Sequence, residues 1–366
     1  MKNLFRSGVF CAVFALLSGL PAPASGEGKL TVASWSGSYL RSQMLGSIRP
    51  FEKATGIDVE VVSYTGGIED IREQVFARNV KWDVVDLELF DAIRANREGL
   101  LAEIATDSLP PAPDGTPAGE DFLKGTLLDF GVGSIVFSTV VAYNRDRIDE
   151  PPPTLEGFFD LQRYPGHRGL RRTPKVNLEW ALLADGVPAD KVYPLLETEA
   201  GLDRAFAVLD RIKPQIVWWE RGLEAVRMLE RGEVRMTSAW SGRVFAAQER
   251  GVPLAILWDR QVWHFDVWSV VKYTNNRQAA MRFVRYATST DSLARQARHI
   301  PYGPVRRSSL EKLPQATRAR LPTAPENSAT AFETDARWWA ENLDRIEPRF
   351  ERWIERPVMV PQKLRR

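Results

Sequence analysis

The sequence predicts an α/β fold of two lobes, with a hinge between two βαβ sheets. Short runs of strand character alternate with amphipathic helices along most of the chain, which is typical of parallel sheets with helical crossovers. A chain of 366 residues also exceeds what one hydrophobic core normally supports. Finally, the apolar run at 131–144 is longer than a typical strand, as expected of a segment that leaves one sheet and enters another.

The first 24 residues are expected to be a targeting signal. Lys2 and Arg6 precede an apolar stretch that is too short to span a bilayer, and Ala22-Pro23-Ala24 fits a signal-peptidase site. An uncleaved N-terminal anchor is the alternative. We therefore expect export to the periplasm, with cleavage near Ala24.

The charge and cysteine content of the exported chain narrow the functional classes. Loss of Lys2 and Arg6 reduces the 49 basic residues to 47, which equals the number of acidic residues. Without a global basic field, no nucleic acid is expected as a partner. The one cysteine, Cys11, lies in the signal, so the exported chain would have no disulfide, no catalytic thiolate and no cysteine metal ligand.

The first lobe is expected to comprise residues 25–138 and 267–303. Its first part alternates strands and helices in the order 30–34 (strand), 40–55 (helix), 57–62 (strand), 68–78 (helix), 83–87 (strand) and 90–98 (helix). In parallel sheets ligands bind beyond the carboxyl ends of the strands. Three loops therefore converge on one place, at 35–39, 64–67 and 86–88.

The second lobe is expected to comprise residues 139–266 and 304–366. It repeats the alternation, with strands at 169–172, 215–219, 234–239 and 253–258 and helices at 177–184, 202–212, 223–231 and 241–250. A strand at 266–271 then returns to the first lobe, followed by a helix at 277–288 and a largely helical C-terminal part. The two crossings, near 137–141 and 264–268, are the predicted hinge.

The sequence contains no recognisable catalytic motif. The three histidines, His167, His264 and His299, lack zinc-site spacing. The glycine-rich pieces do not match a P-loop, a dinucleotide fingerprint or a nucleophile elbow. We therefore expect a binding protein rather than an enzyme, with neither metal nor cofactor. An exported hydrolase is the alternative of another class.

Aromatic and acidic side chains are the candidate ligand-binding residues. Flat aromatic faces attract an organic cation, and a carboxylate can accept hydrogen bonds from it. These residues cluster at the carboxyl ends of predicted strands and beside the second crossing. The predicted site consists of Trp35, Ser36, Tyr39, Asp86, Glu88, Trp240, Ser241, Trp263, His264, Asp266 and Tyr302.

Structural roles compete with these assignments. Asp86 could cap a helix, and Glu88 could simply favour the positive end of a helix dipole. His264 is expected to pack or to form hydrogen bonds rather than to act as a base. Six other tryptophans are expected to be core residues, namely Trp82, Trp218, Trp219, Trp258, Trp268 and Trp353.

A basic segment supports a different ligand. Arg171, Arg172 and Lys175 precede a predicted helix N-terminus, where an anion could bind, although Glu179 in the first turn would oppose it. A solvated basic edge is the structural alternative. If these side chains face the cleft, the ligand would be anionic or zwitterionic.

Several motifs together resemble the periplasmic solute-binding proteins of ABC importers, in the spermidine/putrescine-binding branch. They are VASWSGSY, PFEKATGIDVEVV, WDVVDLE, EGLL, GLRRTPKVNLEWALLADG, IKPQIVWW, ERGEVRMTSAWSGRVFAA, LWDRQVWHFDVWSVV and IPYGPV. The resemblance implies a type II binding-protein fold and capture of a ligand by lobe closure. It also implies a monomer that delivers the ligand to an inner-membrane permease with a cytoplasmic ATPase.

The resemblance also implies specific site residues. The aromatic box of the branch falls on Trp35, Tyr39, Trp240 and Tyr302, and its cleft carboxylate on Asp266. The sequence departs from the branch at three places: His264 replaces an aromatic residue, a Ser/Tyr pair is replaced near 86–88, and an acidic pair falls in the basic segment 172–176. The main hypothesis is a polyamine-like cation such as putrescine or spermidine, and the alternative is an anionic or zwitterionic ligand.

Overall fold

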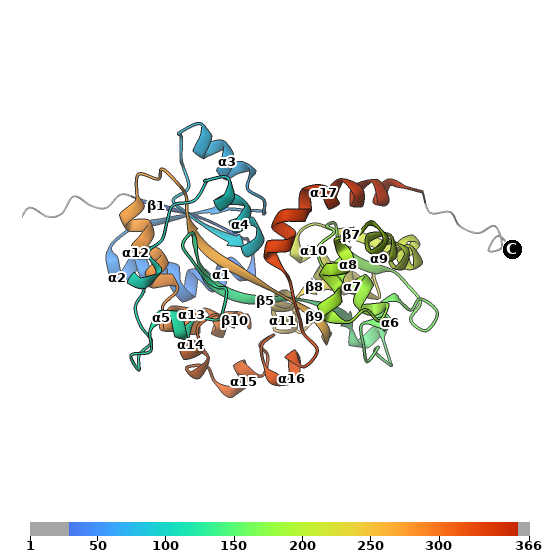
Figure 1. Ribbon diagram of the computed structural model, residues 1–366. Helices are drawn as coiled ribbons and strands as arrows, with labels where there is room; N and C mark the ends of the chain where they lie inside the picture. Colours follow the sequence, from blue (N-terminus) through green and yellow to red (C-terminus); the bar gives the residue numbers. More distant parts are fainter. Residues whose placement is uncertain (1–28, 358–366) are drawn as a thin grey trace, which may run out of the picture.

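A computed structural model describes residues 29–357 and shows two α/β lobes joined by long strands (Figure 1). The signal predicted at residues 1–24 lies outside this range. Within the described residues, the strands form one continuous sheet in the order β2-β1-β3-β9-β5-β8-β6-β7. The predicted two-lobed α/β fold is confirmed, and the two predicted sheets are hydrogen-bonded into one through β9 and β5.

The first lobe is built on three parallel strands, with β1 between the other two. They are β1 (Leu30–Ser34), β2 (Val59–Ser63) and β3 (Val84–Glu88). The helices that follow them are α1 (Ser38–Gln43), η1 (Met44–Ile48), α2 (Arg49–Thr55), α3 (Glu69–Phe76) and α4 (Leu89–Arg97). The single helix predicted at 40–55 therefore contains a π-helical turn, η1, which directly follows Gln43.

Two long antiparallel strands connect the lobes. They are β5 (Gly131–Asn144) and β9 (Leu254–Val270), which run side by side through the middle of the molecule in Figure 1. The sequence predicts two separate strands, 253–258 and 266–271, whereas the structure has a single strand, β9, that spans the predicted gap. Residues 262–268 pair with β5 and are part of the strand. The main irregularity of β9 lies at 258–261, where Arg260 has a φ of 52°.

The second lobe repeats the parallel arrangement, with β6 between β7 and β8. Its strands are β6 (Arg168–Arg171), β7 (Ile216–Trp219) and β8 (Met236–Trp240). Its helices are α6 (Glu156–Phe159), α7 (Asn177–Ala184), α8 (Val192–Leu196), α9 (Glu199–Ile212), α10 (Gly222–Arg231) and α11 (Ser241–Gln248). Because β6 and β8 both end at the lobe junction, the loops after them face the first lobe.

The C-terminal region contacts both lobes. Its elements are α12 (Arg277–Ala287), α13 (Thr290–His299), β10 (Gly303–Pro304), α14 (Arg307–Glu311), α15 (Gln315–Arg318), α16 (Pro325–Ser328), β11 (Phe332–Glu333) and α17 (Ala336–Glu355). Arg306 pairs with Asp121 and so fastens the start of α14 to α5 (Ala118–Asp121) of the first lobe. We therefore propose that the first lobe extends past residue 303, beyond the predicted boundary.

Helix α17 packs on the second lobe and also reaches the first. Trp339 on α17 donates to Glu179 over 2.6 Å. At the other side of the cleft, Arg94 and Arg97 of α4 pair with Asp344 and Glu341 of α17. The short elements that remain are 3₁₀ turns at Thr106–Ser108, Arg145–Arg147, Ala189–Lys191 and Lys213–Gln215, and the strand β4 (Leu127–Leu128).

Each lobe has its own apolar core, rich in aromatic residues. Of the tryptophans predicted to be core residues, Trp219, Trp268 and Trp353 are buried, which confirms those three predictions. Trp82, Trp218 and Trp258 are only half-buried, but pack against the core clusters. Among residues 29–357, no helix combines the length and the apolar character that crossing a bilayer requires.

The buried Arg306–Asp121 pair should contribute strongly to the stability of the first lobe. Both side chains are at least 97% buried, and Arg306 Nε donates to Asp121 Oδ2 over 2.5 Å. Asp121→Ala would leave the Arg306 guanidinium buried without its carboxylate, which costs about 3–5 kcal/mol. We expect urea unfolding followed by circular dichroism to show this loss. Arg307→Gln, at an exposed neighbour, is the control and should change stability little; an equal loss in both variants would contradict the prediction.

Candidate ligand-binding site

A small cavity lies at the junction of the two lobes. The first lobe contributes residues from the loop after β1, the end of β3 and the middle of β9, whereas the second contributes the end of β8 and the start of α11. The crossing strand β5 forms the remaining wall. The lining residues are Trp35, Tyr39, Glu88, Ile135, Phe137, Trp240, Arg243, Asp266 and Tyr302.

Five aromatic rings surround this cavity. Trp35 directly follows β1 and Trp240 ends β8, so the two indoles meet across the lobes with ring centres 6.4 Å apart. Phe137 of β5 lies 6.1 Å from both Trp240 and Tyr302. Tyr302 in turn lies 5.6 Å from Tyr39. Edge-to-face contacts of this kind hold the rings in place and leave their faces available for a ligand.

Asp266 supplies a carboxylate with free hydrogen-bonding capacity. The antiparallel pairing of β3 and β9 places Asp266 directly opposite Glu88. Asp266 is buried, and its Oδ1 has no hydrogen-bond partner among the described residues. Burial, together with the negative charges of Asp86 and Glu88, raises the pKa of Asp266 well above its usual value. A buried acceptor without a partner is costly, so a donor on a ligand would be stabilising here.

Asp86 lies beneath Asp266 rather than on the cavity wall. It accepts a 2.7 Å hydrogen bond from Gln43 Nε2 and longer ones from the hydroxyls of Ser34 and Ser134. Burial raises the pKa of Asp86 to about 7, although these hydrogen bonds lower it. Because Asp86 and Asp266 are both buried and close, they disfavour each other's ionisation.

Glu88 differs from the other two carboxylates because two cations of the second lobe neutralise it. Lys175 Nζ lies 2.7 Å from Glu88 Oε2, and Arg171 Nη1 lies 3.4 Å from Oε1. Burial alone would raise the pKa of Glu88, but Lys175 and Arg171 outweigh it and lower the pKa to about 2. Glu88 is therefore ionised and paired, whereas Asp266 is poised to interact with a ligand.

Arg243 brings a positive charge to the same cavity. Its Nη2 donates to the Ser36 carbonyl over 2.8 Å, and its Nη1 donates to Ser38 Oγ over 3.0 Å. Gly37 has a φ of +74°, and a Cβ there would lie 2.6 Å from Arg243 Nη1, so only glycine allows this approach. The buried Nε of Arg243 has no partner among the described residues, which leaves one donor for a ligand.

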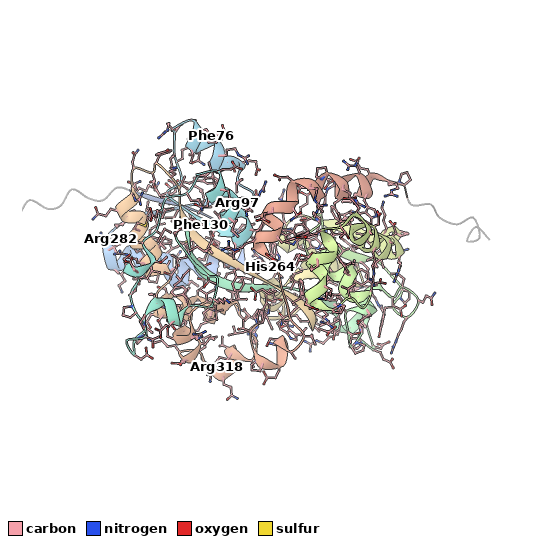
Figure 2. All side chains as sticks on the ribbon, in the orientation of Figure 1. Phe76, Arg97, Phe130, His264, Arg282 and Arg318 are labelled. Carbon is pink, nitrogen blue, oxygen red and sulfur yellow. The ribbon has the colours of Figure 1, made fainter. Side chains whose placement is uncertain are left out.

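A second small cavity adjoins the first and shares Glu88, Phe137 and Trp240 with it. His264 lies on its wall and stacks on Phe137, with ring centres 4.9 Å apart. Figure 2 shows His264 between the lobes. Burial lowers the pKa of His264 to about 3, so it is neutral and shares a 3.2 Å hydrogen bond with Thr139 Oγ1.

The structure brings together six of the predicted site residues at the first cavity: Trp35, Tyr39, Glu88, Trp240, Asp266 and Tyr302. Ser36 contributes its carbonyl to Arg243, and Ser241 is buried with its hydroxyl unpartnered among the described residues. Trp263 does not line the cavity: side chains alternate along a strand, so it points away from the face that carries His264 and Asp266 and packs into the core of the first lobe.

Three lining residues are missing from the sequence-based set: Ile135, Phe137 and Arg243. Arg243 could have been found, since it lies in the first turn of the helix that follows Trp240. Ile135 and Phe137 read as ordinary residues of an apolar strand and carry no such signal. Of the basic segment, Arg171 and Lys175 face the cleft, whereas Arg172 pairs with Glu351 at the surface.

The raised pKa of Asp86 predicts a specific pH dependence of stability. Its usual pKa is 3.8 and its folded-state pKa is about 7, so between these pH values the folded protein holds a proton that the unfolded chain releases. This contribution to stability is complete below the lower value and is lost as the pH rises through about 7.

Asp86→Asn should remove this contribution. We expect the stability of the variant, relative to that of the unaltered protein, to increase as the pH rises from 5 to 8. Urea unfolding at a series of pH values measures this difference. Asn276, which is also hydrogen-bonded but lies away from the cavity, provides the control variant Asn276→Ala, whose difference from the unaltered protein should stay constant with pH. Parallel stability curves for Asp86→Asn would refute the raised pKa.

Comparison with known proteins identifies the family. The family model for bacterial extracellular solute-binding proteins matches residues 47–325. The γ-aminobutyric acid (GABA)-binding protein of Pseudomonas aeruginosa is 38% identical over 352 residues, which cover 95% of this chain and 98% of that protein.

Solved structures agree with this result. An ABC transporter substrate-binding protein from Bradyrhizobium japonicum has a TM-score of 0.81 at 29% identity, with 90% of this chain and 100% of that chain covered. The Atu4243-GABA receptor has a TM-score of 0.80 at 30% identity, with 90% of this chain and 98% of that chain covered.

Similarity to the polyamine branch is more distant than the sequence motifs suggested. The spermidine/putrescine-binding periplasmic protein of Salmonella typhimurium is 23% identical over 261 residues, which cover 70% of this chain and 73% of that protein. The transport role predicted from the sequence is confirmed, and it implies a small-molecule ligand, a periplasmic location and a membrane permease with its ATPase as partners. The chain belongs to the bacterial extracellular solute-binding protein family and is the non-enzymatic, substrate-binding component of an ABC importer.

Proposed function

We propose that this protein captures a small zwitterionic amino acid with separated charges, such as GABA, and releases it to its permease. One observation carries the proposal: Asp266 and Arg243 line a single cavity, and each has a buried polar atom without a partner among residues 29–357. They are Asp266 Oδ1 and Arg243 Nε. A ligand with an ammonium at one end and a carboxylate at the other would satisfy both.

The Asp266 end of the cavity suits a primary ammonium. An ammonium donates up to three hydrogen bonds, and Asp266 Oδ1 is available to accept one. The hydroxyl of Tyr39 is also buried and unpartnered in the described part of the chain, and it lies beside Asp86 and Asp266. The surrounding aromatic rings add a cation–π attraction of about 0.5–2 kcal/mol.

The Arg243 end suits a carboxylate. A guanidinium is always charged and has a planar set of donors that matches a carboxylate. Two of its nitrogens are held by the first-lobe loop at Ser36 and Ser38, so the side chain is fixed in place when the lobes are closed. Trp35 Nε1, which is buried and unpartnered within residues 29–357, is a further donor on the same wall.

This arrangement favours a zwitterion over a polyamine, which was the main sequence-based hypothesis. The second ammonium of a diamine would meet the positive charge of Arg243, and like charges in a desolvated site cost several kcal/mol. The GABA-binding protein of Pseudomonas aeruginosa and the Atu4243-GABA receptor are also the more similar relatives. The alternative hypothesis of a zwitterionic ligand therefore replaces the polyamine hypothesis.

Ligand capture and lobe closure are coupled in this proposal. Asp266 lies on the first-lobe part of β9, whereas Arg243 belongs to α11 of the second lobe. A ligand that binds both residues can do so only when the lobes are close together. Its binding free energy therefore stabilises the closed form relative to the open form.

Isothermal titration calorimetry of the purified protein tests the proposed ligand. We expect one GABA per chain, with weaker binding of putrescine, n-butylamine and butyrate, each of which lacks the charge pair. Quenching of tryptophan fluorescence should follow the same order, because Trp35 and Trp240 line the cavity. Tighter binding of putrescine than of GABA would overturn the assignment.

Arg243→Gln and Asp266→Asn should each weaken GABA binding by about 1.5–3 kcal/mol, since each removes a charge-assisted hydrogen bond. Arg243→Gln should weaken butyrate but spare n-butylamine, and Asp266→Asn should do the reverse. Arg250→Gln is a matched control, since Arg250 follows the same helix but pairs with Glu230 outside the cavity. If both single-charge ligands respond equally to each variant, the assignment of the two ends is wrong.

A further inference from the structure

We propose that Lys175 and Arg171 determine specificity by neutralising Glu88, so that the site accepts one ammonium and rejects diamines. This inference rests on the proposed function and extends it to two residues that do not bind the ligand's own charges. It assigns a role to the basic segment after β6. The ligand class it excludes is a chain with an ammonium at each end.

The contacts of Lys175 show that it is built into the site rather than left at its edge. The side chain comes from the second lobe and is 93% buried between two groups of the first lobe. Its Nζ lies 2.7 Å from Glu88 Oε2 and 3.1 Å from the centre of the Phe90 ring. A buried ammonium with both a carboxylate and an aromatic face is well compensated.

Arg171 holds the other oxygen of the same carboxylate. Its Nη1 lies 3.4 Å from Glu88 Oε1, and its guanidinium lies 5.1 Å from the centre of a Trp240 ring. Both oxygens of Glu88 are thus directed toward cations of the protein. Glu88 nevertheless lines both cavities, which places its carboxylate where a second ligand ammonium could reach it if it were free.

The charges around the two cavities explain why this pairing matters. In the proposed function Asp266 binds the ligand's single ammonium, and Asp86 is not on either cavity wall. Glu88 is the only other carboxylate on the two cavity walls, as far as residues 29–357 show. With Lys175 and Arg171 in place, both oxygens of Glu88 are occupied by cations of the protein, and Asp91, the other carboxylate that acts on Lys175, pairs with Arg94. Without Lys175 and Arg171, Glu88 would attract a cation.

The backbone next to Lys175 is strained, which agrees with a functional position. Val176 has a φ of 69° and a ψ of −44°, a conformation that a β-branched residue rarely adopts. Val176 directly precedes α7 and lines the second cavity together with Lys175.

The test is the affinity of Lys175→Met for putrescine and for n-butylamine, measured by calorimetry. Both amines have a four-carbon chain, and only putrescine carries a second ammonium. We expect the variant to bind putrescine at least about tenfold more tightly than the unaltered protein does, the gain that one charge-assisted hydrogen bond provides. Binding of n-butylamine should not change to the same extent.

Two further variants make the result specific. The double variant Glu88→Gln/Lys175→Met should lose the gain, because it has no free carboxylate to offer. Arg172→Met removes a charge from the same segment without contacting Glu88 and should show no gain. If Lys175→Met does not fold, Arg171→Met frees the other oxygen of Glu88 from a less buried position and is expected to show the same selective gain.

The outcomes separate this inference from the proposed function. If the unaltered protein does not bind GABA, the proposed ligand is rejected. The putrescine affinity of Lys175→Met still tests the present inference. If Lys175→Met and Arg172→Met bind putrescine equally well and both still bind GABA, the role of Lys175 is overturned while the proposed function stands. A gain that survives in the Glu88→Gln double variant would show that Glu88 is not the group that Lys175 neutralises.

Discussion

The lobe junction is organised by the need to compensate three buried carboxylates, Asp86, Glu88 and Asp266. Bare carboxylates cannot be buried without protonation or a cation, because desolvation costs more than the fold can supply. Each one is compensated differently. Hydrogen bonds and a raised pKa stabilise Asp86, two cations pair with Glu88, and Asp266 keeps an oxygen without a partner among the described residues. In the proposed function, a ligand donor completes the last of these.

The crossing strands make this compensation depend on how the lobes are placed. Asp266 lies opposite Glu88 in one antiparallel register, so the first lobe fixes both carboxylates. The cations that pair with Glu88, Lys175 and Arg171, come from the second lobe. Charge pairing across the junction therefore opposes lobe opening, while the irregular segment 258–261 of β9 gives the connection a point where the backbone can adjust.

Local sequence patterns were enough to predict most of the fold. Strand 131–144 and helix 177–184 have the predicted bounds, and the aromatic residues at the carboxyl ends of β1 and β8 meet as the parallel topology requires. The break expected in β9 was wrong, because pairing with β5 maintains strand geometry through His264. Phe137 and the pairing of Lys175 with Glu88 escaped prediction since each depends on contacts between residues far apart in sequence.

The basic segment explains why the nature of the ligand was harder to predict than the transport role. In the sequence, Arg171 and Lys175 look like an anion site, and Asp266 looks like a cation site, so neither sign is favoured. The structure shows that Arg171 and Lys175 pair with Glu88, whereas Arg243, which the sequence-based set omitted, has a donor without a partner among the described residues. What remains available is one negative and one positive group in a single cavity. We propose that this balance, rather than the number of acidic residues, selects a ligand with one charge of each sign.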